Sequence, residues 1–201
     1  MGQEKIIVGL TGQTCSGKST VSKIFEENGF YIIDADKVAR EVAEYPEILD
    51  AISKEFGEKY IVDGHLDRKA LGRLVFANRN KLDRLNEIMH PEICQRMLNL
   101  ACSCEERYVL FDAPQLFESG LNIHCKLIVG VIADNSVIMK RLLRRDKLTI
   151  TEAENRLKSQ LSKQFFIDNS DYIIYSEYDS YEATKQTSER VLKSIKARDF
   201  D

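Results

Sequence analysis

The sequence predicts an α/β fold, a parallel five-stranded sheet with helices on both faces. Five short and mostly apolar runs alternate with longer segments of helical spacing along the 201 residues. Strands of a parallel sheet are buried on both faces, so they are expected to be apolar throughout rather than alternating. The predicted strands are residues 5–10, 30–33, 108–111, 127–132 and 172–175.

The first predicted strand leads into a glycine-rich turn and then into a helix. After the turn, Val21, Ile24 and Phe25 recur at helical spacing. This pattern predicts a helix over residues 19–28, which ends at Gly29.

A long insertion separates the second and third predicted strands. Apolar residues recur in it at helical spacing, so residues 37–107 are expected to form a mostly helical insertion in a single domain of residues 1–201. Asp63-Gly64 is a turn signal inside it. Pro91 suits the first turn of a further helix, where a missing N–H group is tolerated.

The part of the chain after the fourth strand is rich in charged helices. Residues 135–146 are predicted to form a basic helix, and residues 182–196 the last helix. Between them, Thr151 and Glu154 have the spacing of a capping box, which predicts another helix starting there.

The composition is typical of a compact domain with its own core. The chain is 43% hydrophobic and 30% charged, its five cysteines are expected to be free thiols, and its net charge of −3 argues against a nucleic-acid binder. No run approaches the roughly 20 apolar residues of a membrane helix, and the N-terminus has no signal-peptide pattern. We therefore expect a cytoplasmic protein without a membrane partner, as a monomer or weak oligomer.

One motif points directly to a phosphate-binding site. Residues 12–19, Gly-Gln-Thr-Cys-Ser-Gly-Lys-Ser, match G-x-x-x-x-G-K-[ST] between a predicted strand and a predicted helix. Glycines let the backbone curl around a phosphate, so that N–H donors and the positive end of the helix dipole converge on it. Lys18 is expected to reach the β and γ phosphates of ATP, and Ser19 to bind Mg²⁺. The predicted nucleotide-binding residues are Gly12, Gln13, Thr14, Cys15, Ser16, Gly17, Lys18, Ser19 and Thr20.

Cys15 lies inside this loop, near a lysine and the start of a helix. Both features lower the pKa of a thiol and favour the reactive thiolate. We therefore expect preferential alkylation of Cys15 and its protection by ATP. The alternative is a side chain that only fills space.

Three carboxylates follow predicted strands. Asp34 and Asp36 follow the second strand, and Asp112 ends the third. Ligands bind beyond the carboxyl ends of the strands in open α/β sheets, so a carboxylate there could take the proton of an alcohol acceptor. One of Asp34 and Asp36 is also expected to cap the next helix. Asp112 matches a Walker B element that supports Mg²⁺, or it simply begins a turn.

A concentrated block of positive charge lies in residues 140–163, a predicted basic lid region. A phosphoryl-transfer enzyme needs cations to neutralise the triphosphate, and arginines on a mobile lid can supply them. Arg141 and Arg145 are four residues apart and share one helix face, so at least one of them is expected to contact ATP. A solvated helix face is the alternative.

Taken in order, these motifs resemble the dephospho-coenzyme A kinase family over most of the chain. No single piece is diagnostic, but their order is hard to reconcile with another kinase family. The matching features are Gly9-Leu-Thr-Gly12, Ser16-Gly-Lys-Ser-Thr20, Ile33-Asp-Ala-Asp36, Ala39-Arg40, Phe56-Gly57, Asp63-Gly64, Arg68-x-x-Leu71, Val75-Phe76, His90-Pro91, Pro114-x-Leu-Phe-Glu118, Arg141, Arg145-Asp146 and Gln160.

The resemblance implies a P-loop kinase fold. It also implies that the protein catalyses the last step of coenzyme A biosynthesis. In this reaction the γ-phosphate of ATP passes to the ribose 3'-hydroxyl of dephospho-coenzyme A. The resemblance also implies that Asp36 is the base toward this hydroxyl, and that Arg40 and the insertion around His90 help to hold the substrate. Arg141 and Arg145 would belong to the lid. The catalytic residues would then be Lys18, Asp36 and Arg145.

Three departures from the family pattern leave room for another acceptor. The loop is poorer in glycine at residues 13–15, Gln115 stands where leucine is usual, and Ser176 follows the last strand where Asp-Asn is usual. A nucleoside or nucleotide monophosphate kinase is therefore the alternative enzyme. A non-kinase P-loop NTPase regulator is a more remote alternative, because the chain has no Asn-Lys-x-Asp guanine-recognition tetrad.

Overall fold

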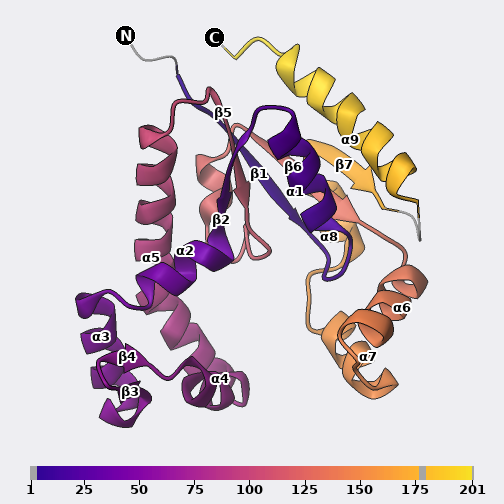
Figure 1. The fold of residues 1–201 in the computed structure, drawn as a ribbon. Helices are drawn as coiled ribbons and strands as arrows, with labels where there is room; N and C mark the ends of the chain where they lie inside the picture. Colours follow the sequence, from indigo (N-terminus) through magenta and orange to yellow (C-terminus); the bar gives the residue numbers. More distant parts are fainter. Residues whose placement is uncertain (1–3, 177–179, 201) are drawn as a thin grey trace. The chain divides into compact units, whose positions relative to one another are not determined.

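The computed structural model describes residues 4–176 and 180–200, and within them the predicted strands form one parallel five-stranded sheet (Figure 1). The strand order is β2-β5-β1-β6-β7. The predicted α/β class is therefore confirmed. The strands are β1 (Ile6–Gly12), β2 (Tyr31–Asp34), β5 (Tyr108–Asp112), β6 (Leu127–Ile132) and β7 (Tyr172–Tyr175).

Strand β1 is paired on both of its edges, in parallel with β5 and with β6. The register sets Leu10 beside Asp112 and Gly12 beside Val131. The chain therefore leaves β1 between the ends of two neighbouring strands, and the loop that follows starts at the carboxyl edge of the sheet.

Helices pack on this sheet from the segments between and after the strands. In Figure 1, α1 and α9 lie side by side, and both also contact the sheet. Helix α8 packs against β6, and α6 packs against α7. These helices are α1 (Lys18–Glu27), α6 (Asn135–Arg145), α7 (Ile150–Lys158), α8 (Lys163–Asp168) and α9 (Tyr181–Lys196), with a 3₁₀ turn at Leu121–His124.

One hydrophobic cluster lies between the sheet and the pair α1 and α9. The predicted stripe of α1 is buried there, and Phe25 packs edge-to-face on Phe30 with 5.0 Å between ring centroids. The buried members are Ile6, Val8, Leu10, Val21, Ile24, Phe25, Phe30, Leu110, Leu127, Val129, Val131, Ile174, Val191, Leu192 and Ile195. This cluster holds α1, and with it the loop that precedes α1, against the sheet.

The chain divides into two compact units. The first comprises Met1–Ile32 and Cys104–Asp201, and the second comprises Ile33–Ser103. The second unit is built mainly of helices, in which α2 and α4 each pack against α5. Its elements are α2 (Ala35–Val42), α3 (Pro46–Phe56), a 3₁₀ turn at Glu58–Tyr60, the antiparallel pair β3 (Ile61–Val62) and β4 (His65–Leu66), α4 (Arg68–Phe76) and α5 (Arg79–Ser103).

Two local predictions are wrong. Pro91 does not start a helix but lies inside the 25-residue α5; packing against α2, α3 and α4 maintains this helix although proline removes one of its backbone hydrogen bonds. The capping box that starts α7 is formed by Thr149 and Glu152 rather than by Thr151 and Glu154. Thr149 has the extended backbone that an N-cap requires, whereas Thr151 is already helical.

No disulfide joins the five cysteines, all of which lie in the described ranges. No group of three or more His, Cys, Asp and Glu side chains that could hold a metal ion occurs among the described residues. None of the described helices is both long and apolar enough to cross a membrane.

Phe25→Ala should lower the free energy of unfolding by about 3–5 kcal/mol, because it leaves a cavity in a close-packed core. Phe25 is fully buried. Urea denaturation followed by circular dichroism measures the change. Ile123→Ala is the control, because Ile123 is 77% exposed, and its effect should stay within about 0.5 kcal/mol. Equal losses in the two variants would contradict this description of the core.

Candidate active site

The phosphate loop owes its shape to three residues with positive φ. These are Gly12 (φ 152°), Cys15 (φ 54°) and Gly17 (φ 96°). A Cβ atom on Gly12 would lie 2.1 Å from the carbonyl oxygen of Val131. The backbone of the loop therefore packs directly on β6, and no larger residue fits at position 12.

The second half of the loop presents a group of hydrogen-bond donors. The backbone N–H groups of Cys15, Gly17, Lys18 and Ser19 have no acceptor among the residues that the structure describes. The hydroxyl of Ser16 is also buried without a partner there. Helix α1 begins at Lys18 without a side-chain cap, so its positive end adds to these donors. Such an arrangement is suited to bind a phosphate group.

Lys18 and Asp112 form an ion pair at the edge of this loop. The ammonium group of Lys18 contacts the Asp112 carboxylate, and the two side chains are only 18% and 11% exposed. Asp112 ends β5, which the sheet register sets beside the end of β1. The predicted cation and the predicted Walker B carboxylate are thus brought together.

Arg141 extends from α6 to the phosphate loop. Its Nη1 donates to the carbonyl oxygen of Cys15 at 3.0 Å, and its Nη2 donates to Oγ of Ser176 at 3.1 Å. Ser176 also lies close to the loop, because a Cβ atom on Gly17 would be 2.9 Å from its Oγ. The serine that departs from the family pattern thus helps to orient Arg141.

Arg145, the predicted catalytic arginine, is held by a neighbour in the lid region. Its Nε donates to Asp146 at 2.7 Å, and Arg156 donates to the same carboxylate at 3.2 Å. The hydrogen bond from Arg145 holds the pKa of Asp146 below its usual range. Asp146 in turn lies 4.0 Å from Sγ of Cys15. Of the two predicted lid arginines, the structure brings only Arg141 into hydrogen-bond contact with the loop.

The second unit contains the predicted acceptor-side residues on α2. Asp34 is the N-cap of this helix, and its Oδ1 accepts a hydrogen bond from the Lys37 N–H at 3.1 Å. Asp36 lies in the first turn, is exposed, and makes no hydrogen bond or ion pair with another described residue. Arg40 lies in the last turn, and its carbonyl oxygen accepts from Arg68 at 2.6 Å. The two aspartates therefore differ in their contacts, since the carboxylate of Asp34 is bound to its own helix and that of Asp36 is exposed.

His90 lies in the middle of α5, in the same unit. Its side chain is half-buried, and burial lowers the pKa of its imidazole. The ring is therefore neutral at neutral pH, when it can both donate and accept a hydrogen bond.

The predicted metal ligands are chemically suited to Mg²⁺. Ser19 offers an exposed hydroxyl at the start of α1, and Asp112 offers a carboxylate at the end of β5. Mg²⁺ prefers oxygen ligands and is usually bound by one or two protein groups together with substrate phosphates and water. The residues present therefore fit this ion.

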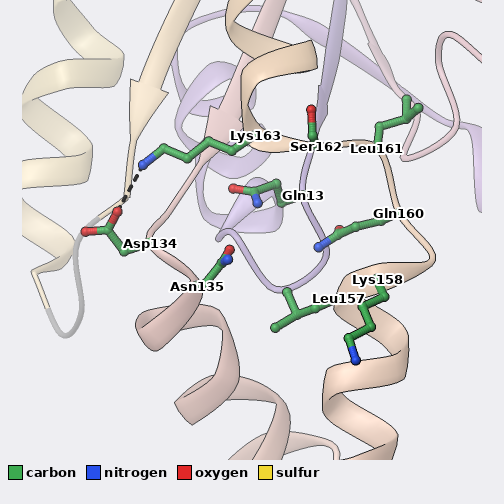
Figure 2. Close-up of a pocket in the computed structure, with 9 residues that line it drawn as sticks. All are labelled: Gln13, Asp134, Asn135, Leu157, Lys158, Gln160, Leu161, Ser162 and Lys163. Carbon is green, nitrogen blue, oxygen red and sulfur yellow. Dashed lines mark hydrogen bonds and ion pairs between the residues drawn. The ribbon is translucent and has the colours of Figure 1, made fainter.

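A polar cluster beside the loop was not predicted from the sequence. Lys163 donates to Asp134 at 2.9 Å, and the hydroxyl of Tyr175 contacts both side chains. The hydrogen bonds from Tyr175 and Lys163 hold the pKa of Asp134 below its usual range. Figure 2 shows the Lys163–Asp134 pair, which joins the start of α8 to the start of α6. The three residues are far apart in the sequence, so no local spacing could indicate the cluster.

Comparison with known proteins identifies the family of the chain. The family model for dephospho-CoA kinase matches residues 6–181. The chain belongs to the dephospho-CoA kinase family. A dephospho-CoA kinase of Fusobacterium nucleatum is 41% identical over 170 residues, which are 84% of this chain and 88% of that relative.

Solved structures agree with the assignment to this kinase family. A dephospho-CoA kinase from Campylobacter jejuni superposes with a TM-score of 0.69 and 28% identity, over 94% of this chain and 96% of the other. The protein TT1252 from Thermus thermophilus superposes with a TM-score of 0.81 and 28% identity, over 97% and 98% of the two chains. The P-loop kinase fold is thus confirmed, and the chain is an ATP-dependent phosphotransferase. These matches do not favour a nucleoside or nucleotide monophosphate kinase.

In this dephospho-CoA kinase family member, the thiol of Cys15 does not have the predicted lowered pKa. Burial raises the pKa of the Cys15 thiol; Arg145 lowers it by a smaller amount, and Asp146 raises it further. The sequence indicated a nearby lysine, but the ammonium of Lys18 is bound to Asp112 instead. Desolvation therefore outweighs the positive surroundings, and Cys15 is a thiol at neutral pH.

Iodoacetamide should modify Cys15 more slowly than the exposed Cys102 near neutral pH, because alkylation needs the thiolate. Since the pKa of Cys15 is raised, the rate of its alkylation should increase with pH. The rate should reach half its maximum at a pH above the usual pKa range of a cysteine thiol. Peptide mass spectrometry after timed labelling at several pH values measures both rates. Modification of Cys15 before all other thiols near neutral pH would restore the prediction of an activated thiolate.

Proposed function

We propose that this kinase transfers the γ-phosphate of ATP to the ribose 3'-hydroxyl of dephospho-CoA. The donor-rich phosphate loop with the Lys18–Asp112 pair, in a chain of the dephospho-CoA kinase family, is the observation that supports the proposal most. Phosphoryl transfer depends on positioning and on neutralising charge, and this loop offers both.

The triphosphate would bind to residues 12–20, where backbone N–H groups and the start of α1 favour negative charge. Lys18 would neutralise charge on the phosphoryl group during transfer. Arg141 is supported as a nucleotide contact by its hydrogen bond to the loop. Arg145 does not contact the loop directly. It is bound to Asp146, which lies next to Cys15 of the loop, and would stabilise the lid region around the nucleotide.

Ser19 and Asp112 would hold Mg²⁺ by their oxygen atoms. When bound, this ion neutralises charge on the β and γ phosphates. Asp112 would also keep the Lys18 ammonium oriented toward the loop, as the ion pair between them suggests.

On the acceptor side, Asp36 would act as the base. Asp34 already caps α2, whereas the Asp36 carboxylate is exposed and makes no bond to another described residue. Asp36 would take the proton of the 3'-hydroxyl as its oxygen attacks the γ-phosphorus and ADP leaves. Arg40 and His90 would help to bind the acceptor, with the guanidinium suited to its phosphates and the neutral imidazole to its polar groups. Residues 37–107 would then form the substrate-binding insertion.

We further propose a cytoplasmic kinase that acts as a monomer or weak oligomer and does not bind nucleic acid. The acidic net charge of −3 supports the last point.

The purified protein should phosphorylate dephospho-CoA and leave nucleosides and nucleoside monophosphates unchanged. Incubation with ATP, Mg²⁺ and each compound, followed by chromatography and mass spectrometry, shows which compound gains a phosphate. Fragmentation of the product should place the new phosphate on the ribose. Faster phosphorylation of a nucleoside or a nucleoside monophosphate would refute the proposed acceptor.

Lys18→Ala should lower kcat by at least about 100-fold, because it removes a cation from the transferring phosphoryl group. A coupled assay for ADP at saturating substrates measures the loss. Lys23→Ala is the matched control on the same helix, because Lys23 is exposed and, among the described residues, pairs only with Glu27 at 3.9 Å. Near-normal turnover by Lys18→Ala would eliminate its assigned role.

Asp36→Asn should lower kcat by about 100-fold or more, because the amide cannot accept the proton. ATP affinity, measured by calorimetry, should stay close to that of the wild type. Asp50→Asn is the control in the same unit, since Asp50 is exposed on α3 and pairs with Lys54 at 2.6 Å and with no other residue in the described ranges. Comparable turnover in Asp36→Asn and the wild type would rule out Asp36 as the base.

A further inference from the structure

Three consecutive residues of the phosphate loop are hydrogen-bonded to the lid region or to the residue that follows β6, Ala133. The side chain of Gln13 accepts from the Ala133 N–H at 3.1 Å, where the chain leaves β6. The N–H of Thr14 donates to Oε1 of Gln160 at 2.7 Å, where the chain returns from α7. The carbonyl oxygen of the next residue accepts from Arg141, as described above. The first half of the loop is thus fastened to the segment that leaves the sheet and to the segment that returns.

Gln13 is fixed in place by burial as well as by hydrogen bonds. It is only 4% exposed, and Ala133 is fully buried. A buried N–H group needs an acceptor, and the Gln13 amide oxygen is the acceptor for Ala133. The backbone N–H of Gln13 also donates to Val131 at 3.2 Å. Both its main chain and its side chain therefore bind the end of β6.

Gln160 makes a second contact with the loop, from the segment that joins α7 to α8. Figure 2 shows the side chains of Gln13 and Gln160 lining one cavity of about 540 Å³, between the loop and the segment that joins α7 to α8. A backbone N–H can only donate, so the amide oxygen of each glutamine must face the backbone. The backbone N–H groups of Ala133 and Thr14 therefore determine the orientation of the two side-chain amides.

We propose that Gln13 and Gln160 are positioning residues that hold the phosphate loop in its nucleotide-binding conformation. This inference rests on the proposed ATP site. Cys15 has a φ of 54°, a left-handed conformation that a residue other than glycine keeps only when its surroundings enforce it. The two glutamine bonds lie on the residues just before Cys15. They supply the constraint that a loop poorer in glycine needs.

The expected consequence is a loss of ATP affinity rather than of the chemical step. Without either bond, the loop spends part of its time in other conformations, and the apparent Kd rises in inverse proportion to the competent fraction. Once ATP is bound, the loop is held by the phosphates themselves. The value of kcat at saturating ATP should then change little.

The test compares Gln13→Met, Gln160→Met and the double variant with the wild type. Methionine is close to glutamine in size but offers no amide oxygen. Calorimetric titration with ATP in Mg²⁺ buffer should show a Kd about 3- to 10-fold higher for each single variant, the range expected for one hydrogen bond. The kcat of Gln160→Met, whose side chain lies outside residues 12–20, should stay within about 2-fold of the wild-type value. The double variant should lose at least as much affinity as the product of the two single losses, because each missing bond multiplies the population of the other loop conformations.

Gln164→Met is the matched control. Gln164 lies on α8 and is exposed, and its side chain donates a hydrogen bond to Asp168 at 2.7 Å. Its ATP affinity should equal that of the wild type. If Gln13→Met fails to fold, Gln160→Met decides alone, because Gln160 is only partly buried.

Unchanged ATP affinity in Gln160→Met, or a fall in kcat with unchanged affinity, would overturn the positioning role. Failure of the wild type to bind ATP would overturn this inference together with the proposed function. Binding of ATP without phosphorylation of dephospho-CoA would count against the acceptor alone. The affinity comparison still decides the role of the glutamines in that case, since it needs no acceptor.

Discussion

The pairing of β1 with β5 on one edge and β6 on the other determines where the parts of the phosphate site lie. Because the three strands are parallel, their carboxyl ends meet, and the register brings Gly12, Asp112 and Val131 to one edge. The close approach of Gly12 to β6 directs the loop, and the burial of α1 on the sheet fixes the helix end that faces it. A loop with several N–H donors would not keep this shape in isolation, since its conformation includes a strained non-glycine residue.

The electrostatics of the site follow from this arrangement. Partial positive charge comes from the loop N–H groups and the start of α1, and full charges come from Lys18 and Arg141. Each full charge is oriented by a hydrogen-bond acceptor, Asp112 in one case and the Cys15 carbonyl with Ser176 in the other. Oriented charges of this kind need little rearrangement when a phosphate binds, which is the basis of electrostatic catalysis.

The strands and the phosphate loop could be predicted from the sequence because both depend on a local pattern of residues. Parallel strands are apolar throughout, and the loop has fixed spacing. The capping box at Thr149 was missed because two threonine–glutamate pairs, two residues apart, compete, and only the backbone conformation selects one. The pKa of Cys15 was predicted in the wrong direction because burial cannot be read from neighbours in the sequence. The contacts of Gln13 and of the Asp134, Lys163 and Tyr175 cluster join distant segments, so only the tertiary structure reveals them.

The bond between Lys163 and Asp134 has a consequence for how this protein can vary. The segment that contains α6 and α7 starts at Asp134 and ends at Lys163. The charged groups of these two residues are 2.9 Å apart. Its ends are therefore already closed, and the entropy of closing a loop grows only slowly with its length. Residues could be added or removed at the tip without shifting β6 or β7. The connection between α6 and α7 can thus change in length at little entropic cost while the sheet stays constant.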